Sequence, residues 1–172
     1  MLERLTAFLG NPAGYHTPLP EADAQHAMGA LLVRAAKADD AYRFVEIALI
    51  DQILGKRHNL NPVEAAKMRA ECELLEREMP RTREIAAILK KAISTAEKEA
   101  TLIALWRVVF ADGVKREEED KLLHRIEEVL GVAPARAKEL QAQATFSIRQ
   151  PDANGILAEK DDGQDGGLTS QI

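Results

Sequence analysis

The chain has 172 residues and a formal net charge of −5, and 46% of its residues are hydrophobic but only 4% are aromatic. This length suits one domain with a sizeable hydrophobic core. The negative charge argues against general nucleic-acid binding, which needs a basic face. No apolar run approaches the roughly 18–20 residues of a membrane-spanning helix, and the amino terminus lacks the order of a secretory signal peptide. We therefore expect a folded, cytoplasmic protein that does not insert into membranes.

Helix signals dominate the first half of the chain, and strand signals are almost absent. Pro20 and the apolar stripe that follows it predict a first helix that ends before Asp39-Asp40. A second helix is expected from about 42 to 54, with Gly55 as its stop. The phrase Asn61-Pro62-Val63-Glu64 combines a cap, a first-turn proline and a capping-box acid, and predicts a third helix to about Glu78.

The second half continues the helical pattern. Helices at about 82–92 and 95–110 are separated by a second capping box, Ser94-Thr95-Ala96-Glu97, which predicts a break between them. Another helix is expected from about 117 to 130, where a glycine follows, and a last one from about 134 to 145. Together these segments predict an all-α, compact bundle of about seven helices.

The domain organisation follows from the same pattern. Residues 1–150 are expected to form one helical domain. Residues 151–172 are rich in Gly, Asp and Gln and lack an apolar period, so we expect a flexible C-terminal tail. Residues 24–80 and 95–147 each contain a helix, an acidic turn and two more helices, which indicates an internal pseudo-two-fold duplication.

One acidic pattern occurs in both halves. An apolar helical run ends in Ala-Asp, at Asp39 and again at Asp112, and a Glu follows seven residues later, at Glu46 and Glu119. Seven residues make nearly two helical turns, so the Asp and the Glu can face one direction. If the halves match, four carboxylates meet. Hard cations such as Ca²⁺ and Mg²⁺ take several oxygen ligands of this kind, whereas without a cation repulsion would raise the pKa of some of these carboxyl groups.

The acidic pattern has two other possible interpretations, an EF-hand loop and a purely structural role. An EF-hand loop is excluded, because its first and third ligand positions would fall on Val108 and Phe110, so any cation site must combine both halves. Alternatively, the aspartates are turn or N-cap residues, and Glu119 lies in a first helical turn, where the helix dipole favours acids. The residues alone leave the cation site and this purely structural interpretation open.

The remaining reactive side chains give weaker signals. The four histidines fall at no metal-ligand spacing, and no phosphate-binding glycine loop or serine-centred nucleophile motif occurs. Cys72 is expected to be a buried or half-buried thiol, and Trp106 falls on an apolar helical stripe, so we expect it in the core. No catalytic residue is assigned.

The acidic pattern resembles a known family. Phe110-Ala-Asp112-Gly113-Val114, followed by Glu119 and a helix ending in Val129-Leu130-Gly131-Val132, resembles the signature of tellurite-resistance protein B and TerB-like domains over about residues 24–147. The resemblance implies an all-helical, duplicated domain with a divalent-cation site, for Ca or Mg, carried by Asp39, Glu46, Asp112 and Glu119. Asp40 replaces the glycine of the first turn, and since Asp tolerates the left-handed conformation less well, we expect that turn to differ.

The function implied by the resemblance is a non-enzymatic module of the stress response and of tellurite resistance. Such a module would bind a divalent cation at these four acids and dock protein partners. One alternative is a metal-dependent hydrolase that uses the same carboxylates around a metal-bound water. The other is a metal-free interaction module whose acids only cap helices.

Overall fold

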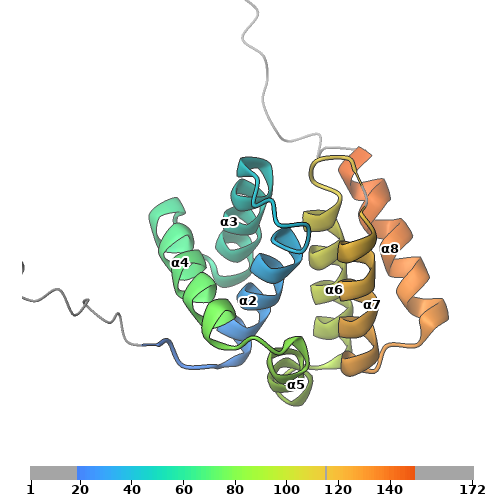
Figure 1. Ribbon diagram of the computed structural model, residues 1–172, viewed down its shortest axis with the longest axis horizontal. Coiled ribbons are helices and arrows are strands. Elements are labelled where there is room, and N and C mark those ends of the chain that lie inside the picture. Colours follow the sequence, from blue (N-terminus) through green and yellow to red (C-terminus); the bar gives the residue numbers. More distant parts are fainter. Residues whose placement is uncertain (1–18, 115, 150–172) are drawn as a thin grey trace, which may run out of the picture.

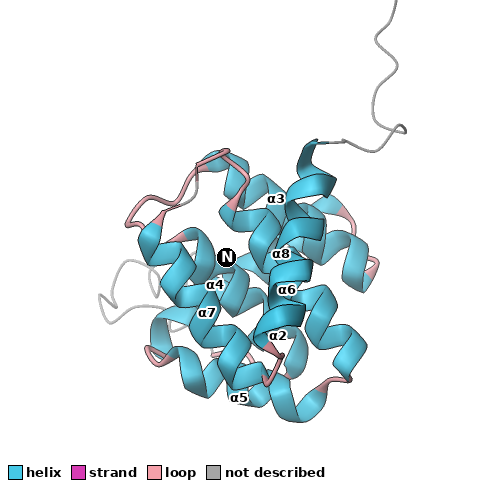
Figure 2. Ribbon diagram, turned by 90° about the vertical axis from the view of Figure 1, so that its right-hand side faces the viewer, coloured by secondary structure: helices cyan, strands magenta, loops and turns pink. Residues whose placement is uncertain are grey.

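The computed structural model describes residues 19–114 and 116–149, and within them the chain is entirely helical, without strands (Figures 1 and 2). This confirms the all-α bundle of seven helices expected from the sequence. Residues 1–18 and the expected tail, residues 151–172, lie outside the described part of the chain. The seven helices are α2 (Ala24–Ala36), α3 (Phe44–His58), α4 (Pro62–Glu78), α5 (Thr82–Ala92), α6 (Thr95–Val109), α7 (Glu117–Leu130) and α8 (Pro134–Arg149).

Helix α2 forms the centre of the bundle. All residues from Ala27 to Ala36 are buried. Apolar or small side chains occupy every position of this stretch except Arg34, whose charge is paired with Glu76 at 3.1 Å. Figure 1 shows α2 between the pair α3 and α4 and the group α6, α7 and α8, with α5 crossing near their lower ends. Trp106 of α6 is fully buried in the same core, as its apolar stripe predicted.

The expected capping signals account for the starts of two helices, α4 and α6. The Asn61 side chain accepts hydrogen bonds from the N–H groups of Val63 and Glu64, both at 3.0 Å, and starts α4. Ser94 and Glu97 form the second expected capping box and separate α5 from α6.

Two helix ends differ from the expectation. The first helix begins at Ala24 rather than near Pro20, because the Asp23 carboxylate accepts a hydrogen bond from the His26 N–H at 2.8 Å and caps it there. Helix α3 passes through Gly55 and ends at His58, since Asn59 adopts the left-handed conformation at φ 53° and provides the C-cap.

The same order of elements occurs in both halves: α2, α3 and α4 in one, α6, α7 and α8 in the other, each with an acidic turn after the first helix. The pseudo-two-fold duplication itself stays a prediction. None of the described helices combines the length and the apolar character that crossing a membrane requires.

Candidate functional site

The first acidic turn connects α2 to α3. An Asp39 carboxylate oxygen, Oδ1, accepts a hydrogen bond from the Ala41 N–H at 3.1 Å, and Asp40 adopts the left-handed conformation with φ 62°. Glu46 is the third residue of α3, and its Oε2 atom accepts a hydrogen bond from the Arg43 N–H at 2.9 Å. Both acids therefore serve as local caps, which is the structural role that the sequence left open.

The second acidic turn connects α6 to α7 and repeats these contacts. Asp112 Oδ1 accepts the Val114 N–H at 2.9 Å, and Glu119 Oε2 accepts the Arg116 N–H at 3.0 Å. Gly113 has φ 77°, the same left-handed region as Asp40. The first turn was expected to differ because Asp40 replaces a glycine. That expectation is wrong for this backbone angle: φ is positive in both turns, because Asp is among the few residues that enter the left-handed region.

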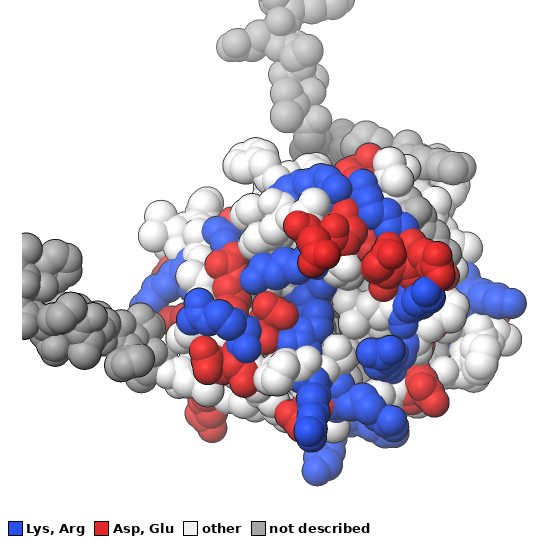
Figure 3. Space-filling view, viewed as in Figure 1, with Lys and Arg blue, Asp and Glu red and all other residues white. Residues whose placement is uncertain are grey.

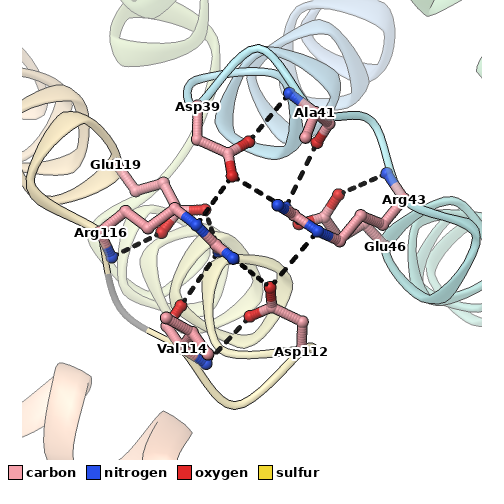
Figure 4. Close-up of polar contacts among 8 residues, drawn as sticks. All are labelled: Asp39, Ala41, Arg43, Glu46, Asp112, Val114, Arg116 and Glu119. Atoms are coloured by element: carbon pink, nitrogen blue, oxygen red, sulfur yellow. Dashed lines mark hydrogen bonds and ion pairs between the residues drawn. The ribbon is translucent and has the colours of Figure 1, made fainter.

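Two arginines join the turns, as Figure 4 shows. Arg43 Nη1 donates to Asp39 Oδ2 at 2.9 Å, and Arg43 Nε lies 3.6 Å from Asp112 Oδ2. Arg116 Nη2 lies 2.8 Å from Asp112 Oδ2, and Arg116 Nε lies 2.9 Å from Asp39 Oδ2. Each aspartate thus faces one arginine from its own half and one from the other half. The six charged side chains, here called the acidic cluster, are Asp39, Arg43, Glu46, Asp112, Arg116 and Glu119.

The glutamates form the buried floor of the acidic cluster. The side chains of Glu46 and Glu119 are 0% exposed, whereas Arg43 and Arg116 are 33% and 24% exposed. Each Glu Oε1 lies 3.6 Å from the Nη1 atom of the arginine in its own half and has no hydrogen-bond partner among the described residues. Buried carboxylate oxygens without a hydrogen bond are costly.

Burial sets the protonation of these two glutamates. It raises the pKa of Glu46 and of Glu119, and the charges of Asp39 and Asp112 add to the rise, although the nearby arginine and the capping N–H oppose it. Repulsion among the carboxylates was expected to raise some pKa values. It contributes to both glutamates, but burial is the larger cause.

The aspartates shift in the opposite direction. Burial also acts to raise the pKa of Asp39 and of Asp112, but hydrogen bonds from arginine and from the turn N–H, with both arginine charges, outweigh it. Their pKa values are therefore lowered, and both aspartates are ionised at neutral pH. The acidic cluster thus pairs two ionised aspartates with two cations above two buried glutamates.

The arrangement has a direct consequence for metal binding. Within residues 19–114 and 116–149, no group of three or more His, Cys, Asp or Glu side chains stands ready to hold a metal ion. The structure does bring all four predicted ligands together, but guanidinium groups lie between the carboxylates (Figure 4). A cation therefore needs Arg43 and Arg116 to move away from them, and the assignment of the four acids as metal ligands stays a prediction.

Sequence reasoning missed the two arginines. Their signal was present, because both halves contain Asp, then Arg four residues later, then Glu three residues after that: Asp39, Arg43, Glu46 and Asp112, Arg116, Glu119. The sequence prediction considered only the carboxylates and therefore left out the arginine that both halves share. The structure shows that these arginines contact the aspartates of both turns.

The comparison with protein families decides the classification. The family described as tellurite resistance protein TerB matches residues 25–142, which include every element from α2 to most of α8 and the whole acidic cluster. The chain belongs to this TerB family. Comparisons with curated proteins and with solved structures gave no match. The resemblance based on the Asp-Gly turn is thus confirmed, and the acidic cluster lies inside the TerB domain.

Proposed function

We propose that this TerB domain is a non-enzymatic, stress-associated module of tellurite resistance that binds a divalent cation at the acidic cluster and docks a protein partner beside it. The observation that carries the cation is the pair of buried Oε1 atoms of Glu46 and Glu119, which lack hydrogen bonds. Ca²⁺ and Mg²⁺ bind carboxylate oxygens of this type, and a cation would relieve the cost of their burial.

The two arginines act in this proposal as resident counter-ions. They are the most exposed side chains of the acidic cluster and carry long flexible stems, so they can turn into solvent without disturbing the core. When they leave, Asp39 and Asp112 each free an oxygen, Oδ2, while Oδ1 keeps its cap. The four acids then offer carboxylate oxygens to one ion, and cation binding competes with the arginines.

Exposed apolar side chains beside the acidic cluster support partner docking. Phe44 is 83% exposed directly after Arg43, and Val114 is 52% exposed two residues after Asp112. Large apolar side chains with this exposure, next to movable arginines, are typical of interface anchors. Cation binding would turn the arginines toward the same surface and thereby couple the ion to the partner.

The support for a non-enzymatic role is the composition of the acidic cluster. It holds carboxylates and guanidinium groups, and each carboxylate caps a turn or a helix start. No side chain in it is a nucleophile of the Ser, Cys or Lys type.

The test is the melting temperature at pH 7 with and without millimolar Ca²⁺ or Mg²⁺. Binding to the folded state raises the melting temperature, so the unmodified protein should gain, and Asp112→Asn should gain less. Glu128→Gln, an exposed acid on α7 outside the acidic cluster, removes the same charge and should leave the gain unchanged. Identical melting curves with and without each ion would reject the cation site and favour a metal-free interaction module.

A further inference from the structure

The groove between α3 and α6 is lined by a second group of charged side chains, none of which belongs to the acidic cluster. The groove has a volume of about 250 Å³. Its floor is apolar and includes Ile53, Ile103 and Ala104, and its charged lining consists of Lys56, Arg57 and Arg107. No carboxylate lines it. In a protein with a net charge of −5, three cations in one groove are an unexpected concentration of positive charge.

Among the residues that the structure describes, these three cations have no ion-pair partner. No carboxylate of the described residues lies within 4.0 Å of their charged nitrogens, whereas most other arginines of the bundle are paired, such as Arg34 with Glu76 at 3.1 Å. On the face of the molecule that Figure 3 presents, acidic and basic side chains are interleaved. Arg57 lies near enough to Glu97 to help lower the pKa of that carboxyl, but does not form an ion pair with it.

Helix dipoles do not account for the groove completely. Lys56 and Arg57 lie in the last turn of α3 and Arg107 in the last turn of α6, where cations stabilise a helix end. Stabilising a helix end does not require the side chain to be buried. However, the Arg107 Nε atom is buried and has no hydrogen-bond acceptor among the described residues. A buried donor without an acceptor costs free energy, so the Arg107 side chain would gain by turning its guanidinium group toward an anion in the groove.

We propose that this groove binds a small phosphate ester, with its phosphate held by Arg107, Arg57 and Lys56 and its apolar part on the isoleucine floor. A phosphate monoester carries about two negative charges at neutral pH and several acceptor oxygens. It matches three cations better than a carboxylate, which carries one charge. Guanidinium groups bind phosphate oxygens through paired N–H donors. The apolar floor favours an ester over free phosphate.

The experiment is isothermal titration with phenyl phosphate at low ionic strength, in a buffer without divalent cations so that the acidic cluster plays no part. The unmodified protein should bind phenyl phosphate more tightly than inorganic phosphate, because the ring covers the floor, and more tightly than benzoate. Arg107→Gln should weaken the binding about tenfold or more, the effect expected for a lost charge-assisted hydrogen bond.

Matched variants keep the test decisive. Lys56→Gln changes an exposed side chain, so it should fold normally, and it should also weaken binding. Arg125→Gln on α7 removes the same charge from an exposed position outside the groove and should bind as the unmodified protein does. The proposal is overturned if phenyl phosphate does not bind, if it binds no better than inorganic phosphate, or if Arg125→Gln weakens it as much as the groove variants.

Discussion

At the scale of single residues, the two acidic turns depend on the left-handed conformation at Asp40 and Gly113. A Cβ atom at Gly113 would meet nothing within 4 Å, so only the backbone conformation restricts this position. An L-residue other than Asn or Asp pays about 1–2 kcal/mol in this region. The first turn accepts Asp40 because Asp tolerates this region better than most residues.

Gly113→Ala should therefore lower the free energy of unfolding by about 1 kcal/mol. Gly113→Asn should lower it less, because Asn enters the left-handed region more readily. The measurement is equilibrium urea unfolding of both variants. Equal losses for Ala and Asn would show that the backbone conformation is not the cause.

Burial of Glu119 predicts a pH-dependent stability. Its raised pKa means that the folded state binds more protons than the unfolded state near and above the ordinary value of 4.5, so its contribution falls as pH rises through that window. Glu119→Gln stays neutral and keeps the oxygen that accepts the Arg116 N–H. The free energy of unfolding of this variant, relative to the unmodified protein, should rise between about pH 4 and pH 7.

Asp112→Asn supplies a control of opposite sign. The lowered pKa of Asp112 contributes stability above its ordinary value of 3.8, and that stability is lost as pH falls through the lowered value. The relative stability of Asp112→Asn should therefore decrease as pH rises from acid to neutral. Curves of the same slope for both variants would contradict the assignment of a buried glutamate floor below ionised aspartates.

At the scale of helices, α2 and α4 pack tightly against each other at Gly29. A Cβ atom at Gly29 would collide with the Sγ atom of Cys72, whose thiol is fully buried and has its pKa raised to about 12 by burial. Cys72 is thus a packing residue, as its helical position suggested. Glycine is required at residue 29 for space rather than for backbone freedom.

Gly29→Ala should lower the free energy of unfolding by about 1–3 kcal/mol through overpacking. In a Cys72→Ala background the same change should cost much less, because the sulfur is gone. A double-mutant cycle measured by urea unfolding gives this coupling. A coupling near zero would mean that another contact limits the approach of α2 and α4.

The helices themselves were largely predictable, and their ends show why some were not. Asn61 and Ser94 were recognised because a cap and an acid three residues later form a local pattern. Gly55 suggests a helix stop because glycine commonly follows helices. It lies instead inside α3, where a Cβ would approach the Leu60 carbonyl oxygen at 3.4 Å, and the left-handed Asn59 ends the helix. Both glycine and asparagine adopt the left-handed conformation at helix ends, so the residue types alone did not decide which of the two ends α3.

At the scale of the whole molecule, the acidic cluster connects the two halves of the chain. Arg116 reaches Asp39 and Arg43 reaches Asp112, so each arginine contacts the other half's turn. The convergence of Asp39, Glu46, Asp112 and Glu119 was predictable from the repeated pattern. The arginines between them were not, because the choice between a bound ion and a neighbouring guanidinium depends on three-dimensional geometry.

The central claim is that a divalent cation competes with Arg43 and Arg116 for the four acids. Isothermal titration of Ca²⁺ and of Mg²⁺ into the unmodified protein and into the double variant Arg43→Gln and Arg116→Gln tests it most directly. Removal of two positive charges within about 4 Å should tighten cation binding roughly tenfold or more, with circular dichroism confirming that the variant is folded. If the folded variant and the unmodified protein both give no binding heat and no change in melting temperature with either ion, the claim is contradicted.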